Sequence, residues 1–75
     1  MTTIDKVKKI AVALYGDRWQ HAAARDLGVH HRQLTRWISG EYNAPDEILE
    51  SMAKIAMQRI ATIDRETRKA LKGVN

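Results

Sequence analysis

Helix-breaking residues are few in this 75-residue chain, and their positions indicate where its helices end. Gly16, Gly28 and Gly40 each follow a segment whose apolar residues recur every three or four positions, as in an amphipathic helix. Pro45 fits the start of a further helix, because proline lacks the N–H group that the first helical turn leaves unused. The sequence therefore predicts an all-α fold, with one domain over residues 1–75.

Four helices are expected, over roughly residues 3–14, 17–27, 31–39 and 46–72. Asp17 and Gln20 have the spacing of a capping box, so the second helix is expected to begin at Asp17. The last segment contains neither Gly nor Pro and would be about 40 Å long as a single helix. A break near residues 62–64 would give a fifth helix, since Asp64 can cap a separate last helix.

The chain is short and contains no cysteine, which limits how its fold can be stabilised. A domain of this size buries only roughly 60–65% of the surface of its unfolded chain. Small domains without crosslinks often gain stability by forming oligomers. The absence of cysteine fits a reducing compartment. No apolar run approaches the length that crosses a bilayer, about 20 residues, and the N-terminus has no apolar signal core. We therefore expect a cytoplasmic protein with no membrane partner.

The segment from Gln20 to Trp37 predicts two short helices joined by a tight turn. Ala24 lets the two helices approach closely, and Gly28 supplies the positive φ angle that the turn requires. Leu34 and Trp37 are expected to anchor the second of these helices to the core, which turns its opposite face outward.

Five positions of this segment match the helix-turn-helix of the phage repressor and Cro family, namely Gln20, Ala24, Gly28, Leu34 and Trp37. The chain resembles that family most strictly within this segment. It departs from the family at His30, where a Ser or Thr helix cap is usual, and in its single long C-terminal segment. The resemblance implies a small all-α helix-turn-helix domain that binds double-stranded DNA, with no cofactor and no small-molecule ligand.

In the family that this segment resembles, the second helix lies in the DNA major groove and its outward side chains contact the bases. Arginine can pair with guanine O6 and N7, and threonine can contact a thymine methyl group or a phosphate. Gln20 would contact a phosphate from the start of the preceding helix, where backbone N–H groups also favour an anion. The expected DNA-binding residues are Gln20, His30, His31, Arg32, Thr35, Arg36, Ser39 and Tyr42.

The charge distribution agrees with a nucleic-acid partner. The net charge of the chain is +4. Residues 1–40 carry seven Lys or Arg side chains against three Asp, whereas residues 41–75 carry six basic and six acidic side chains. The positive field therefore lies in the half of the chain that contains the helix-turn-helix, as binding to DNA requires.

The sequence thus predicts a DNA-binding transcriptional regulator. We expect a dimeric repressor that reads an inverted repeat, with its two recognition helices about 34 Å apart in successive major grooves. The alternative is a helical protein-interaction module, or an antitoxin-type adaptor, that uses the helix-turn-helix as a scaffold. RNA binding is a weaker third choice.

Other functions of the same residues are disfavoured. Taken alone, Arg32 and Arg36 would be interpreted as an ordinary solvated helix face, but the helix-turn-helix positions around them favour contact with DNA. Trp19 is expected in the core rather than stacked on a base. His30 and His31 do not predict a metal site, because adjacent side chains on a helix point about 100° apart. We expect no enzymatic activity, since no nucleophile–base set, phosphate-binding glycine loop or carboxylate pair stands out.

The apolar row of residues 46–72 has two interpretations. It can complete the core, but its second half is longer than the core of so small a domain needs. We therefore expect that second half to form a homodimer, through Met57, Ile60, Ile63, Ala70 and Leu71. A helix lying on a membrane surface is disfavoured by Asp64 and Glu66 among the basic residues.

Overall fold

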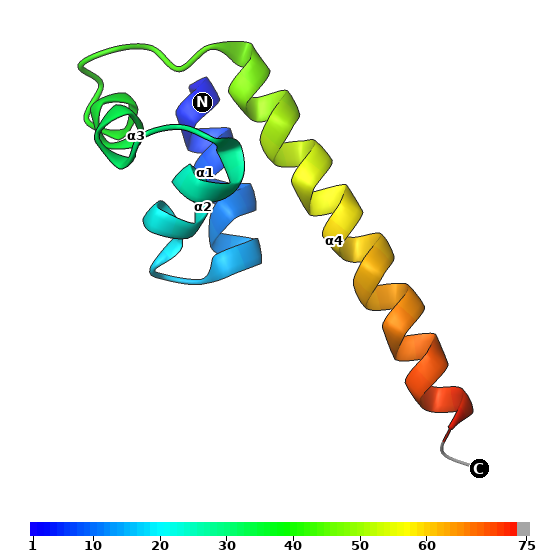
Figure 1. The fold of residues 1–75 in the computed structure, drawn as a ribbon. Coiled ribbons are helices and arrows are strands. Elements are labelled where there is room, and N and C mark those ends of the chain that lie inside the picture. Colours follow the sequence, from blue (N-terminus) through cyan, green and yellow to red (C-terminus); the bar gives the residue numbers. More distant parts are fainter. Residues whose placement is uncertain (74–75) are drawn as a thin grey trace.

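The computed structural model describes residues 1–73, which form four α-helices and no strand (Figure 1). The helices are α1 (Thr3–Tyr15), α2 (Trp19–Leu27), α3 (His31–Ile38) and α4 (Asp46–Lys72). The molecule is elongated, with extents of 55 × 20 × 20 Å, because α4 continues well beyond the other helices (Figure 1). The all-α prediction and the long C-terminal helix are confirmed, and α4 runs through residues 62–64 without the break that a fifth helix needs.

The start of α1 is closed by a capping box. The Thr2 hydroxyl accepts a hydrogen bond from the Asp5 backbone N–H at 3.3 Å, and the Asp5 carboxylate accepts one from the Thr2 N–H at 3.1 Å. These bonds from Thr2 lower the pKa of Asp5. The helix ends before Gly16, whose φ of 83° fits a glycine.

The expected capping box at the start of the second helix is wrong. The structure begins α2 at Trp19, with Arg18 at the N-cap and no side chain bonded to the helix end. Trp19 is only 4% exposed, and burying so large an aromatic side chain outweighs an N-cap, which contributes about 1 kcal/mol. Packing of Trp19 therefore sets the start of α2, and Asp17 stays in the preceding turn.

The turn between α2 and α3 has the geometry that the sequence predicts. Gly28 adopts the left-handed conformation, with φ 73° and ψ 25°. Its N–H donates to the Arg25 carbonyl at 3.2 Å, and the Val29 N–H donates to the Ala24 carbonyl at 3.0 Å. This pattern is a Schellman motif, which satisfies the last carbonyls of α2 and turns the chain into α3.

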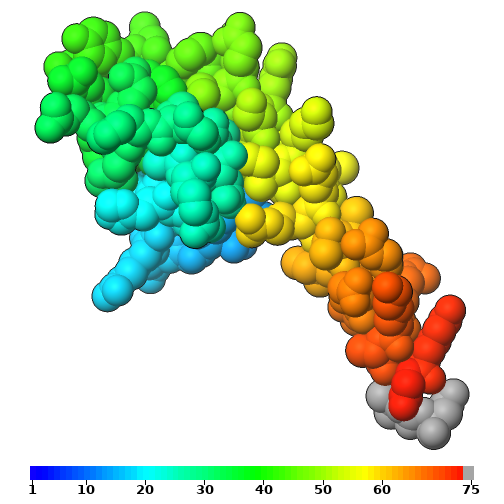
Figure 2. Space-filling model, in the orientation of Figure 1, coloured from blue at the N-terminus to red at the C-terminus, as the bar shows by residue number. Residues whose placement is uncertain are grey.

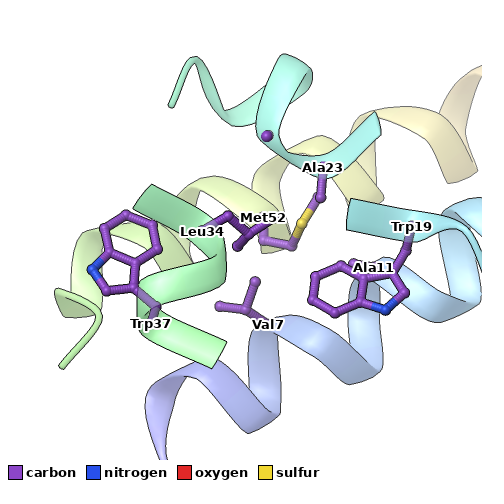
Figure 3. Close-up of a cluster of buried hydrophobic side chains, with 8 residues drawn as sticks. Val7, Ala11, Trp19, Ala23, Leu34, Trp37 and Met52 are labelled. Atoms are coloured by element: carbon purple, nitrogen blue, oxygen red, sulfur yellow. The ribbon is translucent and has the colours of Figure 1, made fainter. Parts of the chain in front are cut away.

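The core lies where α1, α2, α3 and the first half of α4 meet. Figure 3 shows Leu34 and Met52 near its centre and the two indole rings of Trp19 and Trp37 toward its edges. Both tryptophans are buried, as expected. The fully or almost fully buried residues are Val7, Ala11, Trp19, Ala23, Ala24, Leu34, Trp37 and Met52.

The two halves of α4 differ in their surroundings. Pro45 is the N-cap rather than the first helical residue, and Ile48, Leu49 and Ile55 pack against the core beside Met52. From Met57 to Gly73 every residue is exposed. We call residues 1–56 the head and residues 57–72 the projecting segment, which narrows away from the head in Figure 2. None of the helices within residues 1–73 has the length and apolar content needed to span a membrane.

Candidate nucleic-acid interface

Helix α3 is held by one face and exposes the other. Leu34 is completely buried and Trp37 is 5% exposed, so the inward face of α3 is anchored at two points one turn apart. Arg32 lies on the exposed face, and Thr35 and Arg36 are half-buried beside it. The helix therefore presents polar and basic groups from a fixed position, which is the arrangement expected from the sequence.

Arg32 and Gln33 share a shallow depression with His30 and Arg36, with a volume of about 210 Å³. Gln33 was not among the residues expected to contact DNA, although it follows Arg32 directly. Its amide group can pair with adenine N6 and N7, as an arginine pairs with guanine. Because Gln33 lies between Arg32 and Arg36 in the sequence, it could have been predicted as a DNA-contacting residue.

Arg36 and Tyr42 come together at the end of α3. The Arg36 guanidinium lies 5.9 Å from the centre of the Tyr42 ring, which is a cation–π distance. The Arg36 Nε atom is 3.9 Å from a Glu41 carboxylate oxygen, and the two side chains are 42% and 56% exposed. An ion pair this exposed is weak, so a phosphate or a guanine can replace Glu41 as the partner of Arg36.

The hydroxyl groups of Thr35 and Ser39 both donate to backbone carbonyls of α3. The Thr35 hydroxyl donates to the Arg32 carbonyl at 2.8 Å, and the Ser39 hydroxyl donates to the Arg36 carbonyl at 3.0 Å. Both oxygens keep acceptor capacity, and the Thr35 side chain also carries a methyl group. Ser39 lies one residue beyond the helix, at its C-cap, rather than inside it as expected.

The structure pairs His31 with a residue from α2 that the sequence did not single out. The rings of His21 and His31 are stacked, with centroids 4.0 Å apart and planes inclined by 8°. His21 lies in the first turn of α2, next to Gln20. The start of α2 and the start of α3 thus lie side by side, and the exposed His30 directly precedes His31.

The N-terminus of α2 can receive an anion. Gln20 is half-buried in the first turn, and no side chain caps the backbone N–H groups there. Uncapped N–H groups at a helix start favour a phosphate. The first turn of α2 and the exposed face of α3 are therefore both suited to contact one DNA duplex.

A network at the opposite edge of α2 fixes this helix against α1 and α4. The Tyr15 hydroxyl donates to the Asp26 carboxylate at 2.6 Å, and an Arg59 Nη atom lies 2.8 Å from the same oxygen. Arg25 contacts the other carboxylate oxygen at 3.2 Å. The hydrogen bond from Tyr15 lowers the pKa of Asp26, whereas burial and that same bond raise the pKa of Tyr15 to about 12.

The residues expected at a dimer interface lie far from this surface. Met57, Ile60, Ile63 and Leu71 are each at least 60% exposed on the projecting segment. Figure 1 shows the end of α4 and α3 at opposite ends of the molecule. No metal-binding group of three or more suitable side chains occurs within residues 1–73.

Comparisons with known proteins found no match for this chain among protein-family models, curated proteins or solved structures. The function is therefore inferred from the residues of α2 and α3 and from their arrangement.

Proposed function

We propose that this protein binds double-stranded DNA with α3 in the major groove and regulates transcription as a repressor. The single observation that carries the proposal is the exposed face of α3. Leu34 and Trp37 fix that helix to the core, while Arg32, Gln33 and Arg36 line one shallow depression on its outer side. Arginine and glutamine are the side chains that pair bidentately with guanine and adenine.

The surroundings of α3 support the same function. Residues 1–40 have a net charge of +4, from seven basic and three acidic side chains, which would attract the phosphate backbone. The uncapped start of α2 carries Gln20 and is placed beside α3 by the stacking of His21 on His31, so it would set the position of the protein on the duplex. A repressor of this kind would act by occupying a promoter, so its control would depend on its own concentration.

Binding to DNA from upstream of the protein's own gene tests the proposal, by gel shift with and without unrelated competitor DNA. Arg32→Ala or Arg36→Ala should weaken specific binding by about 1–3 kcal/mol and relax the base preference at one position. Arg65→Ala is the matched control, because it removes the same charge from the projecting segment, far from α3. Equal losses in all three variants would contradict a reading role for α3.

Salt dependence separates DNA binding from the alternative function. Binding through phosphates should weaken steeply as salt rises, because bound counterions are released. If the protein binds no DNA even at low salt, that result would instead support the protein-interaction module, in which the helix-turn-helix is a scaffold.

A further inference from the structure

Within residues 1–73 the projecting segment meets the head only near its start, where Arg59 bonds to Asp26 and Ile60 and Ile63 line the edge of α1. All its residues are exposed, yet it continues α4 as regular helix to Lys72. Most helices in proteins depend on the packing of an amphipathic face, since backbone hydrogen bonds alone hold a helix only marginally in water. A face that is covered in the working protein is therefore expected on this segment.

The apolar side chains of the segment lie along one stripe. At 100° per residue, its large apolar side chains and Ala70 fall within about 140° of the helix circumference. That width resembles the buried stripe of a core helix. Met57, Ile60, Ile63 and Leu71 are 67%, 60%, 63% and 67% exposed.

The stripe continues into a groove where α4 leaves the head. The groove has a volume of about 450 Å³ and runs between α1 and α4. Lys9 and Arg59 also line it. Its apolar residues are Ile10, Ala13, Leu14, Ala56, Ile60 and Ile63. Ile60 and Ile63 thus belong both to the groove and to the stripe.

We propose that a second copy of this chain occupies the groove, with the two α4 helices antiparallel about a two-fold axis close to Ile60 and Ile63. Each copy then supplies both the groove and the helix that fills it. A two-fold interface requires such a self-complementary surface. The pairing leaves α3 uncovered at the far end of each head (Figure 1), and it does not depend on DNA binding.

The charges of α4 select the antiparallel orientation. Its first half, residues 46–56, has three acidic residues and one lysine, a net charge of −2. The projecting segment has five basic and two acidic residues, a net charge of +3. Antiparallel helices place these opposite charges side by side, whereas parallel helices would place like charges together. The net positive charge of the projecting segment also argues against a basic partner protein as the occupant.

Mass measurement without DNA tests the pairing. Size-exclusion chromatography with light scattering, at tens of micromolar, should give twice the 8.6 kDa of one chain. Ile60→Asp or Ile63→Asp should raise the dimer dissociation constant by about 100-fold or more, because each dimer would bury two carboxylates. Gln58→Asp is the matched control, since it adds the same charge at an exposed position on the side of α4 opposite the apolar stripe.

The fold of each variant can be checked independently of its mass. Trp19 and Trp37 are buried in the head, so their fluorescence reports the core and should not change in any of these variants. A wild-type chain that stays monomeric overturns the proposal and leaves a different protein as the occupant. A Gln58→Asp variant that dissociates as much as Ile60→Asp also overturns it.

The orientation has its own measurement. The chain contains no cysteine, so Lys72→Cys provides a single site for a spin label. In the antiparallel dimer the two labelled positions should be about 30 Å apart along the helices. Parallel helices would bring them to about 10 Å, the usual interaxial distance. A distance near the shorter value overturns the antiparallel arrangement.

Discussion

The two halves of α4 carry similar apolar rows, but only the first half has a surface to pack against. Met52 is completely buried, whereas Ile63, three turns later and on nearly the same face of α4, is 63% exposed. The difference comes from the head, because α1 ends at Tyr15 and offers no further surface beyond it. Apolar periodicity therefore identifies the face of a helix that will be covered, and the neighbouring elements decide how much of it is covered within one chain.

The largest expected effect comes from comparing the buried Met52 with the exposed Met57. Met52→Ala should lower the free energy of unfolding by about 2–5 kcal/mol, because it removes a fully buried side chain and leaves a cavity. Met57→Ala should change that free energy by less than about 0.5 kcal/mol, the usual range for a surface position. Urea denaturation followed by tryptophan fluorescence measures both.

The methionine comparison should be made in the Ile60→Asp background, in which we expect the chain to be monomeric. Any contribution of Met57 to a dimer is then absent. A loss of more than about 1 kcal/mol for Met57→Ala in this background would mean that the projecting segment packs on its own head, contrary to its exposure.

Those features of the head that depend on local sequence patterns could be predicted from the sequence. Gly28 indicates the turn because the turn needs a left-handed backbone conformation, which glycine adopts easily. Leu34 and Trp37 are buried because they share one face of a short helix. The start of α2 could not be predicted in this way. Asp17 and Gln20 satisfy a local rule, but the burial of Trp19 depends on where α1 lies.

The candidate site shows the same division. The outward position of Arg32 follows from the inward positions of its neighbours on α3. The stacking of His21 on His31 follows instead from how α2 and α3 cross, since the two residues lie on different helices. Contacts between helices depend on their packing angle as well as on the periodicity. The sequence therefore indicated the exposed face of α3 but not that His21 lies beside it.

A smaller effect is expected from two glycines, one in the head and one after the projecting segment. Gly28 has a φ of 73° and no heavy atom close to an added Cβ, so Gly28→Ala should cost only the backbone strain, about 1–2 kcal/mol. Gly73 has a φ of −80°, and an added Cβ would meet only ordinary van der Waals contact at 3.5 Å. Gly73→Ala should therefore leave the thermal midpoint unchanged. A midpoint for Gly28→Ala equal to that of the wild type would show that the turn relaxes.

The smallest expected effect is the difference in unfolding free energy between losing an ion pair at the edge of the head and losing one on the projecting segment. Asp26 joins Tyr15 and Arg59 across three helices, so Asp26→Asn should lower the free energy of unfolding by about 1 kcal/mol at pH 7. Asp64 pairs with Arg68 at 3.0 Å on an exposed helix face. Asp64→Asn should cost no more than about 0.5 kcal/mol.

The pH dependence of this last comparison identifies the carboxylate as the cause. Hydrogen bonding from Tyr15 lowers the pKa of Asp26 in the folded protein, so the charged carboxylate stabilises the fold above the ordinary pKa of 3.8. That contribution is lost as the pH falls below this value and the carboxylate becomes protonated. The difference in unfolding free energy between the wild type and Asp26→Asn should therefore be full at pH 7 and should shrink below pH 3.8. A difference that stays constant down to pH 2.5 would mean that Asp26 acts through its shape and neutral hydrogen bonds, and that the edge of the head is held by packing rather than by charge.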